Sequence, residues 1–183
     1  MKIYTRTGDD GTTGLLGPVR TFKDAPRVEA CGSVDELNAL LGVIGALDTE
    51  RWLAAELATI QSKLFHVGAE LAAVAPDLRA RLECISDEDV TAIERWIDRL
   101  EAELTPLTSF VVPGGSGLGA QLHVARAVCR RAERRTVSLL QAEPIEPRLV
   151  RYLNRLGDLL FVMARWCNRR AGVPETEWHP RRP

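Results

Sequence analysis

The sequence is poor in aromatic residues and in lysine. Aromatic side chains make up 5% of its 183 residues, and Lys2, Lys23 and Lys63 are its only lysines, so arginine supplies nearly all of its 24 basic residues. With 25 acidic residues the formal net charge is −1, which disfavours a protein that binds nucleic acid through its overall charge. A hydrophobic share of 45% with 27% charged residues is typical of a globular protein.

Signals for membranes, secretion, disulfides and zinc are also missing. No uncharged apolar run approaches the ~18 residues of a membrane span, and no apolar segment marks the N-terminus for secretion, so we expect a cytoplasmic protein without a membrane partner. The cysteines and histidines lie far apart, at Cys31, Cys84, Cys129, Cys167, His66, His123 and His179. This spacing predicts reduced thiols and no structural zinc site.

Beyond residue 32, apolar residues recur with helical spacing in five segments that breaks rich in Pro and Gly separate. Ser33-Val34-Asp35-Glu36 has the spacing of a capping box, so the first helix is predicted to begin at Ser33. The third helix is predicted to open with Ser86-Asp87-Glu88-Asp89, because these carboxylates suit the positive end of a helix dipole. We predict an all-α fold, a five-helix antiparallel bundle in one domain over 1–183, with an ordered N-terminal loop over 1–32, the bundle over 33–172 and a C-terminal tail over 173–183.

The N-terminal segment TRTGDDGTTG at 5–14 is rich in glycine and threonine and has no periodicity. Glycines three residues apart let backbone amides converge on phosphate oxygens. The segment is neither a Walker A loop nor a dinucleotide fingerprint, because the lysine and the strand–helix context of those motifs are missing. By itself it fits a surface turn equally well, since Asp9 and Asp10 would repel a phosphate without an intervening metal ion. Lys23, taken alone, is an ordinary exposed lysine.

The densest charge cluster is RAVCRRAERR, with five arginines and one glutamate. On a helix, Arg126, Arg130 and Glu133 fall on one side, beside the apolar stripe, whereas Arg131 and Arg135 point away from it towards solvent. Arginine forks match phosphate oxygens, and partial desolvation strengthens each contact. A phosphate-binding groove and a plain charged surface are about equally compatible with this pattern.

Two further features leave alternatives open. The segment SFVVPGGSG at 109–117 is an apolar run before a helix start, and we favour a plain loop whose Phe110 closes the end of the bundle over an anion site. Asn154 stands between apolar residues of the last helix. It is either a satisfied core amide or a ligand contact.

Six segments follow one another in a specific order: TRTGDDGTTGL at 5–15, Lys23 with APRVEA at 25–30, SVDELNALLG at 33–42, FVVPGG at 110–115, HVARAVCRRAER at 123–134 and YLNRLGDLLFVMAR at 152–165. Together they resemble the ATP:cob(I)alamin adenosyltransferases of the propanediol-utilisation type. The resemblance implies a five-helix bundle that forms a homotrimer, with ATP bound between adjacent subunits. It also implies transfer of the 5′-deoxyadenosyl group of ATP to cob(I)alamin, with Co(I) as the nucleophile and triphosphate as the leaving group.

The resemblance assigns roles to individual residues as well. The loop that wraps ATP would comprise Thr5, Arg6, Thr7, Gly8, Asp9, Asp10, Gly11, Thr12 and Thr13. Phosphate contacts would come from Lys23, Arg126, Arg130 and Arg134, and the nucleotide site would be completed by Glu133 and Asn154. Mg²⁺ would be held through the ATP phosphates, with Glu133 as a candidate ligand.

The resemblance names Arg126, Asp35 and Arg130 as the catalytic group, with Asp35 pairing with Arg126. Phe110 would form the apolar corrin site and exclude the lower axial ligand of cobalt. A reductase and an enzyme that accepts adenosylcobalamin would be the partners. Two other functions remain open from the residues: a carrier that binds finished cofactor, and an arginine-faced bundle that binds RNA.

Overall fold

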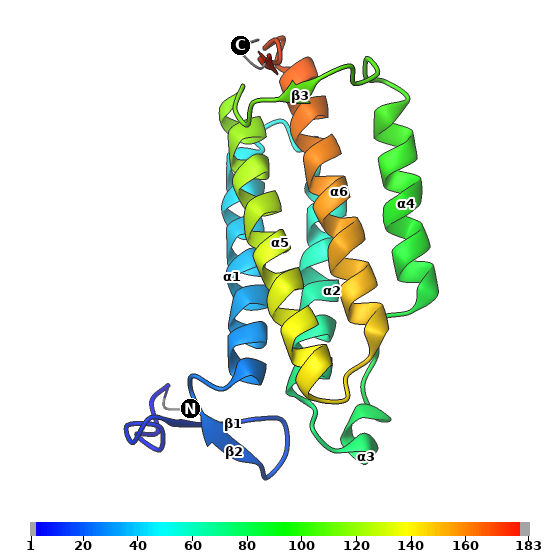
Figure 1. Cartoon of the computed structure of the whole chain (residues 1–183). Coiled ribbons are helices and arrows are strands. Elements are labelled where there is room, and N and C mark those ends of the chain that lie inside the picture. The colour runs from blue at the N-terminus through cyan, green and yellow to red at the C-terminus, as the bar shows by residue number, and fades with distance from the viewer. Residues whose placement is uncertain (1–2, 180–183) are drawn as a thin grey trace, which may run out of the picture.

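The computed structural model describes residues 3–179, which form long helices and two small sheets (Figure 1). The helices are α1 (Pro26–Leu47), α2 (Ala54–Ala72), α3 (Pro76–Arg79), α4 (Asp87–Glu101), α5 (Gly117–Ala142) and α6 (Pro147–Arg170). The strands are β1 (Thr12–Gly14), β2 (Arg20–Phe22), β3 (Phe110–Val111) and β4 (Glu177–Trp178). The predicted helical bundle is therefore confirmed in outline, but "five-helix" and "all-α" were inexact, because α3 is an additional short helix and both ends of the bundle carry antiparallel strand pairs.

Helix α6 forms the centre of the bundle. It packs against α5 on one side and α4 on the other, while α1 packs against α5 and α2 (Figure 1). Leu153, Leu156, Leu160 and Met163 of α6 are fully buried in a single hydrophobic core. Each such side chain stabilises the fold by roughly 1.5–3 kcal/mol when removed from water. This packing fixes the relative positions of α5, which carries the arginine and glutamate residues of the predicted site, and α6, which carries Asn154.

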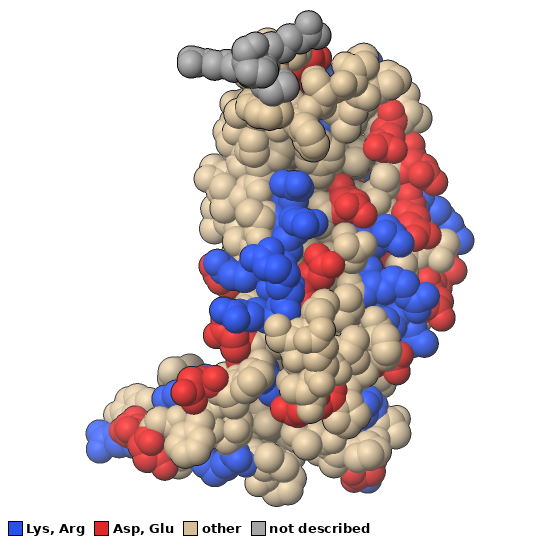
Figure 2. Space-filling model, in the orientation of Figure 1, with Lys and Arg blue, Asp and Glu red and all other residues tan. Residues whose placement is uncertain are grey.

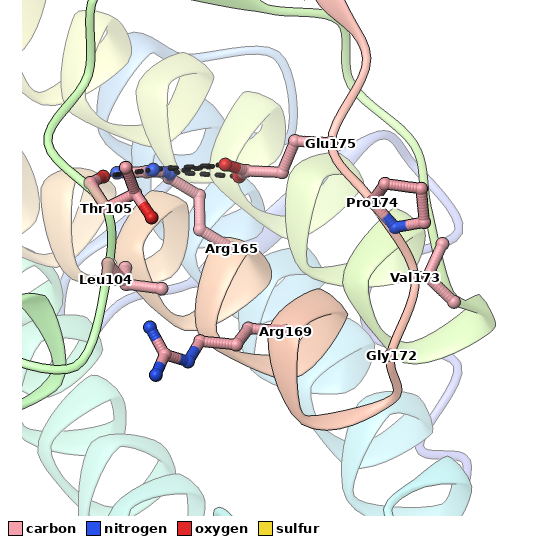
Figure 3. A pocket seen from close by; sticks show the side chains of 8 residues that line it. All are labelled: Leu104, Thr105, Arg165, Arg169, Gly172, Val173, Pro174 and Glu175. Atoms are coloured by element: carbon pink, nitrogen blue, oxygen red, sulfur yellow. Dashed lines mark hydrogen bonds and ion pairs between the residues drawn. The ribbon is translucent and has the colours of Figure 1, made fainter.

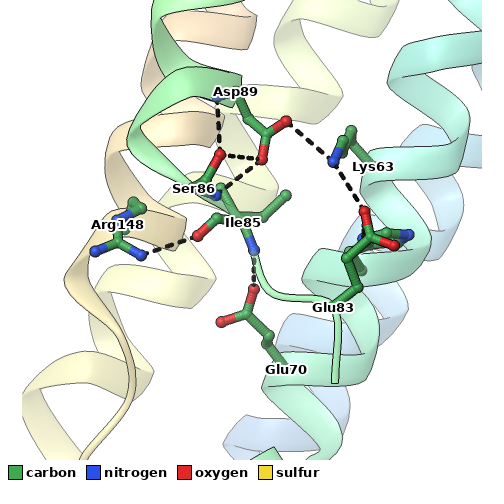
Figure 4. Close-up of polar contacts among 8 residues, drawn as sticks. Lys63, Glu70, Glu83, Ile85, Ser86, Asp89 and Arg148 are labelled. Carbon is green, nitrogen blue, oxygen red and sulfur yellow. Dashed lines mark hydrogen bonds and ion pairs between the residues drawn. The ribbon is translucent and has the colours of Figure 1, made fainter. Parts of the chain in front are cut away.

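The helix starts show where local signals were decisive. The predicted start of α4 is confirmed: Ser86 Oγ accepts a hydrogen bond from Asp89 N at 3.2 Å, and Asp89 Oδ2 accepts one from Ser86 N at 2.8 Å (Figure 4). The predicted start of the first helix was wrong, because α1 begins at Pro26 and Ser33 lies inside it. The Ser33 hydroxyl instead donates to Glu29 O at 2.9 Å. Proline at the first helical position costs no hydrogen bond and already has a helical φ, so the helix extends back to it.

Among residues 3–179, α1 is the one helix long and apolar enough to cross a membrane by length and composition, with a mean hydropathy of 1.3 over 18 residues. Its buried side includes Val34, Leu37, Leu41 and Ile44, which pack in the core of the bundle. A core helix commonly satisfies the same criterion, so this is weak evidence for a membrane span.

A buried carboxylate supports the connection between α3 and α4. Glu70 is 2% exposed, and its Oε1 accepts a hydrogen bond from Ile85 N at 2.6 Å, while Arg148 donates to Ile85 O at 3.0 Å (Figure 4). Burial raises the pKa of the Glu70 carboxyl, because charge is costly away from water. Lys63 on α2 pairs with Asp89 at 3.0 Å and ties the start of α4 to α2.

The two strand pairs lie at opposite ends of the bundle (Figure 1). The β1–β2 hairpin lies at the foot, where Leu16 N donates to Ala72 O at 3.2 Å and attaches it to the end of α2. The β3–β4 pair lies at the other end, beside the start of α5 and the end of α6. Of the predicted tail, residues 173–179 are described and the last four residues lie outside the described part of the chain.

Candidate functional site

Three arginines form a row on successive turns of α5: Arg126, Arg130 and Arg134. Figure 2 shows a column of basic side chains over this helix with acidic side chains next to it. Within residues 3–179, no carboxylate lies within 4.0 Å of these three guanidinium groups, whereas Arg131 pairs with Glu36 and Arg135 Nε lies 3.1 Å from Glu29 Oε1. The row therefore presents positive charge that the described part of the chain does not neutralise, which suits an anionic ligand.

Residues of α6 pack against Arg126 and Arg130 of this row. The guanidinium carbon of Arg126 lies 5.4 Å from the centre of the Phe161 ring, a cation–π distance. A Cβ at Gly157 would come within 3.8 Å of Arg130 Cγ, so the stem of Arg130 lies directly over this glycine. Arg126 is half-buried and Arg130 is exposed. The predicted position of Arg126 and Arg130 beside packed surface is thus confirmed by their contacts to α6.

Glu133 and Asn154 are brought together across the α5–α6 interface. Asn154 Nδ2 donates to Glu133 Oε1 at 3.0 Å, and Asn154 Oδ1 accepts from Arg155 Nη1 at 3.2 Å. Both polar atoms of Asn154 thus have protein partners. Glu133 Oε2 accepts no hydrogen bond from the residues that the structure describes, and so it keeps a free coordination position.

A metal ion would need ligands from the substrate. Between residues 3 and 179, no group of three or more His, Cys, Asp or Glu side chains could hold a metal ion by itself. Mg²⁺ commonly binds through one or two carboxylates together with substrate phosphates and water. The free oxygen of Glu133 beside the arginine row fits that mode of binding.

A cavity of about 300 Å³ lies between β3 and helices α5 and α6, next to the row. Its lining includes Phe110, Val111, Phe161, His123, Arg126 and Arg130. A wider hollow of about 650 Å³ adjoins it, lined by Leu107, Phe110 and Trp178 among others. Phe110 and Trp178 thus form an aromatic wall of these cavities, and Arg126 and Arg130 contribute guanidinium groups to the lining.

Phe110 does not close the end of the bundle as predicted. It lies on β3 and is 78% exposed, with its ring centre 6.3 Å from that of Trp178 in an edge-on arrangement. The two residues face each other in the β3–β4 pair. An aromatic pair held this far out of the core offers an exposed apolar surface to a ligand.

The N-terminal loop is ordered around Lys23 by its own hydrogen bonds. Lys23 N donates to Gly11 O at 2.9 Å, and the Lys23 ammonium lies 3.3 Å from where a Cβ on Gly8 would be.

A second set of hydrogen bonds in this loop centres on Thr12. The Thr12 hydroxyl and amide both donate to Asp10 Oδ1, and these bonds hold the pKa of Asp10 below its usual range. Arg20 Nη2 bridges Thr7 O and Thr12 Oγ1. Gly11 adopts φ +85°, which a residue with a side chain rarely adopts.

The structure does not bring this loop to the arginine row. No hydrogen bond, ion pair or cavity joins residues 3–23 to Arg126, Arg130 or Arg134, and Figure 1 shows the hairpin extending beyond the foot of the bundle. Asp35 is exposed on α1 and forms no ion pair with Arg126 within the described chain. The residues of the predicted nucleotide site therefore form two separate groups within the chain.

Known proteins resemble this chain over nearly its whole length. The family model for cobalamin adenosyltransferase matches residues 3–167. The chain belongs to the cobalamin adenosyltransferase family. It is 44% identical over 182 residues to a corrinoid adenosyltransferase of Bacillus subtilis, which covers 97% of this chain and 92% of that protein. A corrinoid adenosyltransferase of Citrobacter freundii is 47% identical over 164 residues, with coverage of 90% and 93%.

The structural comparison agrees. A variant of the PduO-type ATP:corrinoid adenosyltransferase from Lactobacillus reuteri, complexed with cobalamin and ATP, superposes with a TM-score of 0.93 at 36% identity, covering 97% of this chain and 96% of that one. The predicted family and enzyme class are thus confirmed: this is a corrinoid adenosyltransferase, which uses ATP to adenosylate a corrinoid. The roles of single residues stay predictions.

Sequence reasoning missed three residues of this adenosyltransferase's cavities: His123, Phe161 and Trp178. His123 is 5% exposed, and burial together with the nearby Arg126 charge lowers its pKa. Its position three residues before Arg126 could have placed it on the same side of the helix. Trp178 lies in the predicted tail, where no periodic pattern gave a signal.

Proposed function

We propose that the protein transfers the 5′-deoxyadenosyl group of ATP to cob(I)alamin, giving adenosylcobalamin and triphosphate. The observation that carries this proposal is the row of unneutralised arginines beside a cavity with an aromatic wall. Co(I) supplies both electrons of the new bond to the 5′ carbon. The bond from that carbon to the phosphate oxygen breaks, and its electron pair leaves with the triphosphate.

The chain's own contribution is positioning and charge stabilisation. No protein nucleophile is required, because cobalt attacks directly. Arg126, Arg130 and Arg134 bind the triphosphate and stabilise the charge that builds up on it, together with Lys23. The loop from Thr5 to Thr13 encloses the nucleotide. Partial burial of Arg126 against Phe161 strengthens its contact with the leaving group.

We infer that ATP binds between two subunits of a homotrimer. Two observations support this: the loop and the arginine row are separate within one chain, and Asp35 on α1 is exposed without a partner for its charge there. The loop of one subunit would meet the row of the next, and Asp35 would pair with Arg126 across the same interface. Val43 and Leu47 of α1 are each 49% exposed and add apolar area for such contact.

Mg²⁺ would be held by the ATP phosphates and by the free oxygen of Glu133. When bound, it would neutralise part of the triphosphate charge. Asn154 fixes the carboxylate of Glu133 through the 3.0 Å hydrogen bond and so holds it at the α5–α6 interface.

Phe110 supports the corrin side of the reaction. Its ring beside Trp178 gives an apolar surface that would displace the lower axial ligand of cobalt and so make Co(II) easier to reduce. Cob(I)alamin has to be generated by reduction, so an electron-donating reductase is one partner, and an enzyme that uses adenosylcobalamin is another. We place the protein in the cytoplasm.

The test combines purified protein, Mg²⁺-ATP and chemically reduced cobalamin. We expect light-sensitive adenosylcobalamin by absorbance and intact triphosphate by ion chromatography. Release of pyrophosphate plus phosphate, or an unchanged corrin spectrum, would contradict the proposal. A pure carrier would bind adenosylcobalamin without forming it, and an RNA-binding protein would bind RNA with an affinity that falls steeply with salt.

A further inference from the structure

The C-terminal segment builds half of the aromatic wall. After α6 the chain turns at Gly172, with φ +67°, and runs back as β4 along β3. Val112 N donates to Thr176 O at 2.8 Å, and Phe110 is paired with Trp178. The surface around Phe110 therefore depends on residues that follow the bundle.

This strand pair cannot hold its own position. Each strand has two residues, and isolated two-stranded sheets are marginally stable at best in water. Phe110 and Trp178 are 78% and 51% exposed, so burial of their rings in the core does not anchor them. The strands must be fixed by contacts from neighbouring segments.

Arg165 of α6 supplies such a contact. Its side chain is 4% exposed, and Nε and Nη2 donate to the two oxygens of Glu175 at 2.9 and 3.0 Å (Figure 3). Nη2 also donates to Thr105 O at 2.9 Å. One buried guanidinium thus joins α6, the chain before β3 and the chain before β4. Charged, bidentate hydrogen bonds of this kind are strong and directional.

Arg165 also contacts Phe161, a residue that lines the 300 Å³ cavity. The guanidinium carbon of Arg165 lies 6.0 Å from the centre of the Phe161 ring, and the guanidinium carbon of Arg126 lies 5.4 Å from the same ring centre. Glu175 and Arg165 do not line the 300 Å³ cavity themselves. They contact the elements that do.

We propose that Arg165 and Glu175 are positioning residues for the corrinoid: their ion pair fixes β4 and, through it, the wall formed by Phe110 and Trp178. This inference rests on the proposed function of the cavity. Without the ion pair, β4 is no longer held in place and the Phe110 and Trp178 rings become mobile. The corrinoid then binds more weakly, while the arginine row still binds ATP.

The experiment uses the full chain in steady-state assays with ATP and reduced corrinoid varied separately. Glu175→Gln removes the charge but leaves Arg165 buried without a counter-ion, which is destabilising. The double variant Arg165→Met/Glu175→Met removes both charges and replaces them with apolar side chains, which is often tolerated. The matched control is Glu143→Gln, because Arg27 is likewise 4% exposed, donates twice to Glu143 and also to a backbone carbonyl, at the opposite end of the bundle.

We expect Glu175→Gln and the double variant each to raise KM for the corrinoid about tenfold, which corresponds to ~1.4 kcal/mol. KM for ATP should stay within about twofold of wild type. Glu143→Gln should leave the corrinoid KM unchanged. An unchanged corrinoid KM in the double variant, or a parallel rise in KM for ATP, overturns the inference. If Glu175→Gln does not fold, the double variant decides. Absence of turnover in wild type would instead overturn the proposed function, and corrinoid binding measured by absorbance would then still test the wall.

Discussion

Asn154 on α6 donates a 3.0 Å hydrogen bond to Glu133 on α5. The two residues are far apart in sequence, and the packing of α5 on α6 brings them together. This bond orients a carboxylate between turns of a helix that also carries Arg126, Arg130 and Arg134. The site thus combines a row of arginines with one carboxylate whose second oxygen accepts no hydrogen bond from the described residues.

Arg130→Ala tests the row directly. Arg130 is exposed and contacts Gly157 only through its stem, so its loss should not disturb the fold. Removing one donor to developing charge typically lowers turnover about 10²–10³-fold, and we expect a loss of that size. The measurement is kcat for adenosylcobalamin formation, with circular dichroism to confirm folding.

Arg95→Ala is the control for that change, because Arg95 is a similarly exposed arginine on α4 whose ion pair with Glu88 is on the surface. Such pairs contribute little, so its activity should match wild type. Wild-type turnover in Arg130→Ala would mean that the row is an ordinary charged surface.

Mixed oligomers test the divided site. Lys23→Ala should inactivate the loop half and Arg130→Ala the row half, so each variant alone should be nearly inactive. If ATP binds between subunits, unfolding and refolding the two variants together should restore activity at about a quarter of the sites, as random mixing requires. Mixed oligomers that stay as inactive as the parents would argue for a site within one chain.

Phe110→Ala tests the aromatic wall. Because the Phe110 ring is 78% exposed, we expect the melting temperature to stay close to that of wild type. Turnover with reduced corrinoid should fall at least about tenfold, the equivalent of ~1.4 kcal/mol in the barrier, while ATP affinity is retained. Full activity, or an equal loss of ATP binding, would place the corrinoid elsewhere.

Glu70→Gln tests the buried carboxylate, whose pKa burial raises in the folded state. The folded protein then binds protons more tightly than the unfolded chain, so this group lowers stability as the pH rises above the ordinary carboxyl pKa of about 4.3. Glutamine keeps the oxygen that accepts from Ile85 N but carries no charge. The Tm of the variant relative to wild type should therefore be higher at pH 7 than at pH 4.

Glu83→Gln is the comparison for this pH effect, because the Glu83 side chain is 75% exposed. Its Tm difference from wild type should change little over the same pH range. A Glu70→Gln difference that does not grow with pH would show that the carboxylate is not penalised by its burial.

Local signals predicted the parts of the fold that depend on neighbouring residues. The acidic residues after Ser86 and the breaks at Pro and Gly marked helix ends, because a few adjacent side chains and dihedrals decide them. The same reasoning failed at Ser33, because a capping pattern also occurs inside a helix when an earlier proline can start it. The strand at Phe110 was missed, since its partner lies in the tail and two-residue strands have no periodicity.

The sequence by itself determined the helical bundle, the arginine row on one side of a helix and, through the order of its motifs, the cobalamin adenosyltransferase family. Only the tertiary structure decided which charges stay unpaired: Arg131 and Arg135 meet glutamates of α1, whereas Arg126 lies over Phe161. It also decided that Arg165 joins the tail to the wall at Phe110. These relationships follow from how helices pack against one another, and side chains distant in sequence meet only once the shared core has formed.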